Sequence, residues 1–208
     1  MARLPANEIP ARADIAAVLN RSADLVLVLS STWVYTSAVR FEIDVYKREP
    51  TVPLATYGFG RPERGSTFLL AFEWADDTIS SNLPISELHG GLVHAGSHGG
   101  PQQAHITLRL DHLPPAGEFV IHSAWPYFDL AEDQVSFEAQ RIIDAVEHVQ
   151  TLWPQEVPSF TASDTAPTTV DGVLEAPTTG WFGRQFTAAT QRSKTTDPEG
   201  TGFHVTPG

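Results

Sequence analysis

Alternation of apolar and polar residues predicts a series of β-strands in the first three quarters of the chain. The clearest is segment 39–46, in which every second residue is hydrophobic and most of the residues between are charged. A period of two is typical of a strand with one buried face and one wet face. The other predicted strands cover residues 24–35, 68–74, 78–83, 105–111 and 118–125.

A short connection joins the last two of these strands. It runs over residues 113–117 and contains Pro114, Pro115 and Gly117. Proline removes the amide donor that a sheet ladder needs, and glycine tolerates positive φ, so the segment reads as a turn. Because short connections favour antiparallel neighbours, we expect these two strands to pair.

One amphipathic helix is predicted over residues 136–153. Ser136 is a candidate N-cap, and Pro154 cannot extend the last turn. Apolar residues recur at positions 142, 146, 149 and 153, with polar residues on the opposite face. A stripe of this kind normally packs on a sheet.

Short strands separated by turn residues predict a mainly β fold, a β-sandwich of immunoglobulin-like type with this helix on one side. No helical pattern of ten residues separates the strands, which argues against a doubly wound α/β sheet. The expected organisation is an N-terminal arm or short helix (1–22), the sandwich with its helix (23–154), and an extended tail rich in Thr, Pro and Ser (155–208).

An aromatic cluster interrupts this polar tail. Trp181, Phe182 and Phe186 lie close together between polar residues. If they are exposed, they form a short partner-binding motif. The alternative is that they fold back onto the chain's own domain.

The composition narrows the classes of partner. The formal net charge of −12 argues against nucleic acid or an anionic membrane as the main partner, because phosphate neutralisation needs a basic face. The chain has no cysteine, which excludes disulfides and thiolate metal sites. Its longest apolar block is only of strand length, and no secretory pattern follows the N-terminus. We therefore expect a cytoplasmic protein that does not enter a membrane.

A stretch rich in glycine and histidine, residues 89–100, is the one segment with an evident chemical character. Imidazole binds zinc, copper and nickel, so His89, His94 and His98 are candidate metal ligands. Their spacings of five and four residues match no standard metal motif. Histidines 105, 112 and 122 could add ligands if their strands neighbour this loop. The alternative, which we favour, is a flexible loop with incidental histidines and no cofactor.

Catalytic patterns are weak throughout the sequence. Ser97 lacks the Gly-x-Ser-x-Gly frame of a nucleophile elbow, and Gly58-Phe59-Gly60 lacks the remainder of a phosphate-binding loop. Acidic pairs such as Glu132-Asp133 occur at expected turn or helix-start positions, where carboxylates are common for structural reasons. We therefore expect a protein that is not an enzyme.

The order of several short motifs resembles a family of small bacterial proteins that has no established activity. The pattern begins with Trp-Val-Tyr-Thr-Ser-Ala-Val-Arg-Phe-Glu (33–42) and continues with Leu-Ala-Phe-Glu-Trp-Ala-Asp (70–76). A glycine loop near 90–100, Leu-Pro-Pro-Ala-Gly (113–117), Trp125-Pro126 and Leu-Trp-Pro (152–154) complete it. The resemblance covers about residues 20–155 and implies no site residue.

These observations favour a non-catalytic protein-interaction or assembly module, which binds another protein or further copies of this chain. One alternative is a protein, possibly an enzyme, that binds a metal or small ligand through loop 89–100. Another is a self-assembling structural subunit whose tail straps onto a neighbouring copy.

Overall fold

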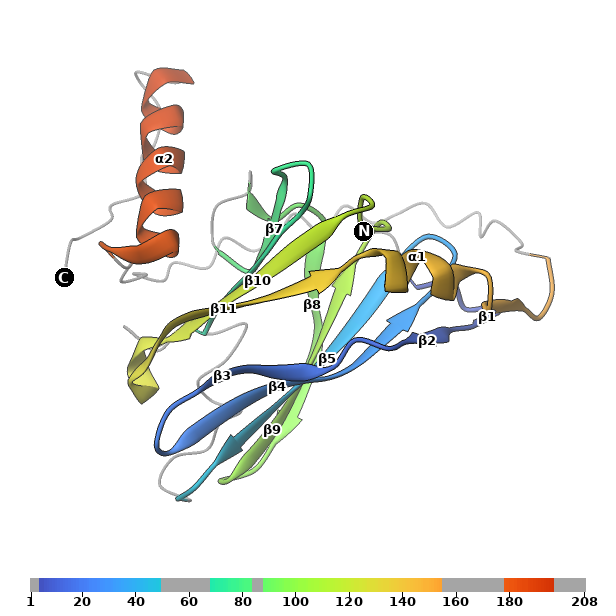
Figure 1. Ribbon diagram of the computed structural model, residues 1–208, viewed down its shortest axis with the longest axis horizontal. Helices are drawn as coiled ribbons and strands as arrows, with labels where there is room; N and C mark the ends of the chain where they lie inside the picture. The colour runs from blue at the N-terminus through green and yellow to red at the C-terminus, as the bar shows by residue number, and fades with distance from the viewer. Residues whose placement is uncertain (1–3, 50–67, 84–87, 155–177, 197–208) are drawn as a thin grey trace, which may run out of the picture.

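The computed structural model describes residues 4–49, 68–83, 88–154 and 178–196. Its architecture is mainly β, with two antiparallel sheets packed face to face, a small two-stranded ribbon and a C-terminal helix (Figure 1). The predicted fold class is confirmed, while the immunoglobulin-like strand arrangement stays a prediction.

The larger sheet has six strands in the order β2-β4-β5-β9-β8, with β3 also pairing with β4. Its strands are β2 (Ala11–Ala13), β3 (Ala17–Arg21), β4 (Leu25–Val34), β5 (Val39–Lys47), β8 (Leu92–Gly99) and β9 (Gln103–Leu110).

The smaller sheet has four strands in the order β11-β10-β6-β7. Its strands are β6 (Leu69–Glu73), β7 (Ile79–Ser81), β10 (Glu118–Trp125) and β11 (Leu130–Glu138). The ribbon consists of β1 (Glu8–Ile9) and β12 (Gln150–Thr151). The helices that lie wholly within the described residues are the single turn η3 (Pro126–Phe128), α1 (Gln140–Val146) and α2 (Gly180–Thr196).

The main core lies between the two sheets, as strand alternation requires. Phe41 of β5 meets Phe72 of β6 with ring centroids 4.7 Å apart, and both rings are fully buried. Phe119 and Trp125 of β10 belong to the same cluster. Full burial of a side chain of this kind stabilises the fold by about 1.5–3 kcal/mol, so this layer is the principal source of stability.

The predicted pairing of strands 105–111 and 118–125 is wrong. β9 pairs with β5 and β8, whereas β10 pairs with β6 and β11 in the other sheet. Each strand already has a neighbour on both sides, so the turn between them carries the chain from one sheet to the other. Gly117 has a φ of 123° in this turn, and a Cβ there would lie 2.7 Å from the Ala75 side chain.

The predicted helix over residues 136–153 is much shorter in the structure. Ser136 does not cap a helix, because it pairs with Val120 inside the β10–β11 ladder. Val135 and Phe137 pack against the core at a strand spacing of two. Helical structure is confined to α1, which buries Ile142 and Ala145, while Trp153 is 58 % exposed.

Two other segments form strands where the sequence predicted none. Residues 8–21, expected as an arm or a short helix, contain β1, β2 and β3 and no helix. Asn20 of β3 donates to the carbonyls of Ser123 and Ala131 in the other sheet. The glycine- and histidine-rich segment is strand β8 rather than a flexible loop. In both cases the segment forms a strand because it hydrogen-bonds to another strand, and its local sequence alone does not indicate this.

The tail contains α2, which the sequence analysis did not predict. The predicted extended conformation of residues 155–177 and 197–208 falls outside the described residues. No helix in the described ranges is both long and apolar enough to cross a membrane.

Candidate functional site

The three aromatic residues of the tail are buried within the chain's own fold. Trp181, Phe182 and Phe186 are 7 %, 0 % and 6 % exposed, and all three lie on α2. They belong to a second hydrophobic cluster that covers the outer face of the four-stranded sheet, with Leu69, Ala71, Leu83, Leu88, Ala124 and Ala189. These residues are therefore not displayed as a partner-binding motif. They anchor α2 to its own chain, as the alternative interpretation expected.

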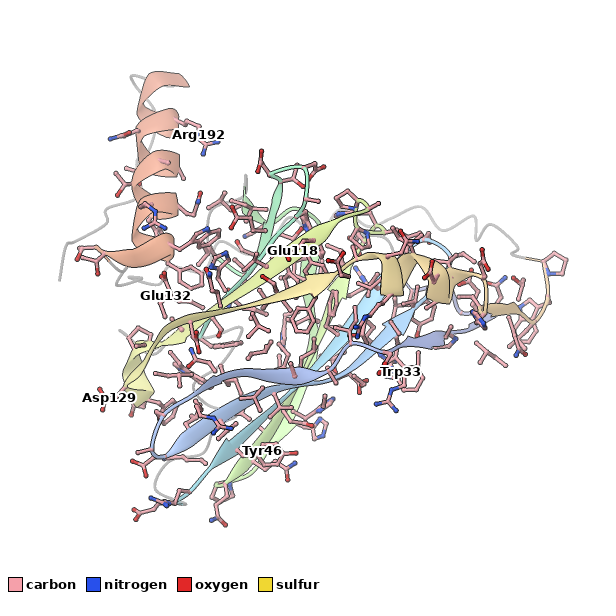
Figure 2. All side chains as sticks on the ribbon, in the orientation of Figure 1. Trp33, Tyr46, Glu118, Asp129, Glu132 and Arg192 are labelled. Atoms are coloured by element: carbon pink, nitrogen blue, oxygen red, sulfur yellow. The ribbon has the colours of Figure 1, made fainter. Side chains whose placement is uncertain are left out.

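Polar contacts fix the first turn of α2 on the sheet. Glu132 of β11 accepts hydrogen bonds from the backbone amides of Trp181 at 2.5 Å and of Phe182 at 3.1 Å. The first amides of a helix have no partner inside it, and a carboxylate there also meets the positive end of the helix dipole. Figure 2 shows Glu132 beside the end of α2 nearest the sheet.

A buried histidine joins this contact to the sheet. The ring of His122 on β10 stacks on Trp181 at 4.1 Å and 13°, and its Nε2 lies 2.8 Å from an oxygen of Glu73. The same Glu73 oxygen accepts the Trp181 indole N–H at 3.0 Å. His122 is 2 % exposed, and its Nδ1 has no hydrogen-bond partner among the described residues. The arrangement holds the first turn of α2 on the four-stranded sheet.

The three histidines predicted as candidate metal ligands do not converge. His89 is exposed before β8, His94 lies opposite Leu108 on the core side of the sheet, and His98 lies opposite His105 on the outer side. Burial lowers the pKa of His94, although a backbone hydrogen bond with Gly96 opposes the shift. No group of three or more His, Cys, Asp or Glu within the described ranges could hold a metal ion.

A different set of groups meets on the outer face of the six-stranded sheet. Asp44 of β5, His105 of β9 and His98 of β8 occupy directly opposite positions on three neighbouring strands. The His105 Nδ1 lies 2.8 Å from an Asp44 oxygen, and the His105 and His98 rings are 4.9 Å apart. A shallow open hollow of about 450 Å³, lined by residues 98–105, adjoins the pair.

A polar network continues this face along β4 and β5. Glu42 accepts a hydrogen bond from the Ser31 hydroxyl at 2.7 Å and pairs with Arg40 at 3.1 Å. The Arg40 guanidinium in turn lies over the Trp33 ring, 5.6 Å from its centroid. Trp33 and Tyr46, both labelled in Figure 2, are therefore outward-facing aromatics among charged residues.

Strand β8 forms one edge of this sheet, opposite the edge formed by β2 and β3. In the described residues β8 pairs with β9 on one side, and no strand pairs with its other side. A bulge at Ala95 interrupts the ladder, and the following residues Ser97, His98 and Gly99 are exposed. Ser97, considered above as a nucleophile, lies opposite Ile106 in this strand.

Sequence reasoning missed the residues that this geometry brings together. His105 was considered only as an added ligand, and the roles of Asp44, Glu73 and Glu132 were not anticipated. One usable signal was the spacing of Phe182, Phe186 and Ala189, four and three residues apart, which is a helical stripe. The comparisons with family models, curated proteins and solved structures found no match for this chain.

Proposed function

We propose that this protein is a non-catalytic assembly module in which two copies of the chain join along the free edges of their β8 strands. The observation that carries the proposal is an uncharged sheet edge with which no strand of the described residues pairs. An unpaired edge presents free backbone donors and acceptors, and it is a template for pairing with another strand.

The distribution of charge favours this edge over β11, an edge of the four-stranded sheet. Residues 88–108 contain no Asp, Glu, Lys or Arg, although the chain as a whole carries a net charge of −12. Two acidic copies therefore approach with less repulsion at β8 than at β11. By contrast β11, an edge strand of the other sheet, carries Glu132, Asp133 and Glu138 among its exposed residues. Such charges are a usual protection against edge pairing.

The symmetry and size of the contact follow from the strand. Antiparallel pairing of β8 with its copy places the same surface on both sides of a two-fold axis, as in most homodimers. The bulge at Ala95 bends the strand, so the regular run available for pairing is Gly96–Gly99. A contact this short predicts a weak, concentration-dependent dimer with a Kd in the micromolar range.

The test is sedimentation velocity and native mass spectrometry over a concentration series of the full chain. Ser97→Asp and Ser97→Lys each place like charges near the two-fold axis, so both are expected to weaken the dimer about tenfold. Ser136→Asp changes an exposed residue on β11 and serves as the matched control. Circular dichroism checks that each variant keeps its strand content.

A wild-type chain that stays monomeric through high micromolar concentration contradicts the proposal. So does a dimer that both Ser97 variants leave unchanged. Opposite responses to Asp and Lys also contradict two-fold pairing, because they indicate a charged partner surface that is not a copy of β8.

A further inference from the structure

We propose that His98 and His105 form a chelating pair for a divalent transition-metal ion of the copper, nickel or zinc type. The inference rests on the side-chain geometry of the β8–β9 hairpin and is independent of the proposed dimer. It replaces the set His89, His94 and His98, which the structure does not bring together.

The register of the sheet places the two rings side by side. His98 and His105 are directly opposite residues on β8 and β9, and their ring centroids are 4.9 Å apart with an interplanar angle of 40°. Neighbouring imidazoles at this separation need only side-chain rotation to direct one nitrogen each toward a shared ion. Imidazole nitrogen suits copper, nickel and zinc.

Asp44 sets the chemical state of one ligand. Its carboxylate lies 2.8 Å from the His105 Nδ1, and an ionised carboxylate can only accept a hydrogen bond. The neutral ring therefore carries its proton on Nδ1 and has its lone pair on Nε2. Metal-binding histidines almost always have such an outer partner, which fixes the ring and raises its basicity.

The position of Asp44 also orients the lone pair. Asp44 is on β5 and His98 is on β8, so they flank His105 from opposite sides in the same row of the sheet. With Nδ1 turned toward β5, the Nε2 atom is directed away from Asp44. It is then available to an ion on the side of β8 and the solvent.

The surroundings leave room for an ion and its waters. The hollow beside the pair is lined by residues 98–105, which include Gly99 and Gly100 and no Lys or Arg. His98 is exposed, and the side chains of His105 and Asp44 are 23 % and 18 % exposed. With two protein donors, water fills the remaining coordination positions, and a moderate micromolar affinity follows.

The experiment titrates the tag-free full chain with Cu(II) and reads binding by isothermal titration calorimetry and electron paramagnetic resonance. We expect one equivalent per chain with micromolar affinity and two nitrogen ligands in the spectrum. His98→Ala and His105→Ala should each weaken binding at least tenfold and leave one nitrogen ligand. Asp44→Ala, which removes the outer partner, should weaken binding about tenfold while both nitrogens remain.

The controls are the other two histidines of the same stretch. His89→Ala removes an exposed imidazole and His94→Ala removes a core-facing one, and neither should change affinity or spectrum. An unchanged Kd and spectrum in the His98 and His105 variants overturns the proposal, as does the absence of a stoichiometric site in the wild type. Ser97→Asp keeps both ligands, so loss of the dimer and loss of the metal site are separable results.

Discussion

The outer faces of the two sheets differ in composition and in whether a helix covers them. On the four-stranded sheet the outward positions include Leu69, Ala71 and Ala124, and α2 covers them. On the six-stranded sheet the outward positions of β5 are Arg40, Glu42, Asp44 and Tyr46, and no described helix packs on them. The alternation of residues along each strand thus decides which face needs a cover.

The uncovered face reaches stability by other means. Its charged groups pair across and along strands, as in the contacts of Glu42 with Ser31 and Arg40 and of Arg109 with Asp111 at 2.7 Å. A cross-strand pair such as Ser31–Glu42 contributes about 0.2–1 kcal/mol, and partly exposed ion pairs contribute a similar amount. A face built of such pairs is stable in contact with water. The apolar face under α2 is not, because removal of the helix exposes its hydrophobic side chains to solvent.

The largest effect that should separate the two faces comes from Phe182→Ala. The ring is fully buried under α2, and large-to-small changes at such sites cost about 3–5 kcal/mol. If α2 detaches as a unit before the sheets unfold, the loss of global stability is limited to the free energy with which α2 docks on the sheet. Hydrogen exchange of the α2 amides measures the free energy of docking, and urea unfolding measures the global stability.

Tyr46→Ala is the matched change on the uncovered face. Tyr46 is 44 % exposed, and truncation there should change stability by less than about 0.5 kcal/mol. Equal losses for the two variants would remove the distinction between a covered and an uncovered face.

A smaller effect should come from Glu132→Gln. The amide keeps an acceptor for the first turn of α2 but removes the charge that two backbone amides and the helix dipole favour. We expect a loss of about 1 kcal/mol, seen as faster exchange of the α2 amides. Glu138→Gln, an exposed carboxylate on the same strand, should leave this exchange unchanged.

The smallest effect concerns pH and the core side of β8. Burial lowers the pKa of His94, so the unfolded chain takes up a proton at higher pH than the folded one. Stability from this group is present above the unfolded value of about 6.5 and falls as the pH drops below it. Urea unfolding between pH 7.5 and about 5 should show that the free energy of unfolding falls less steeply in His94→Gln than in the wild type. A steeper loss in the variant would contradict this sign.

How much of this fold the sequence predicts depends on whether the interactions involved are local or join residues far apart in the chain. Strands with strict alternation, such as 39–46, were predicted correctly because every second side chain is buried and is therefore hydrophobic. The pairing of β9 with β10 was predicted wrongly, since a five-residue turn is compatible both with a hairpin and with a crossing between sheets. Apolar residues in segment 136–153 are spaced partly at a strand period and partly at a helical one. Ser136 lies in a strand because it pairs with Val120 of β10, and the local sequence does not show this partner.

The candidate sites were harder to predict because they join distant segments. Trp181 contacts Glu73 across 108 positions, and His105 contacts Asp44 across 61. Composition identified the aromatic cluster and the histidines, but register identified their partners. Without strand order, no local pattern could place His98 beside His105 and away from His94.

The contact of α2 with β6 has a consequence for synthesis of the protein. Glu73 is made 108 residues before Trp181, which at roughly 5–20 residues per second is about 5 to 20 seconds earlier. Every strand of both sheets emerges from the ribosome before α2 does. From the completion of β11 at Glu138 until α2 is made, the apolar face of the four-stranded sheet is open to chaperones and to neighbouring nascent chains. The docking of α2 therefore ends a period of exposure in every newly made molecule.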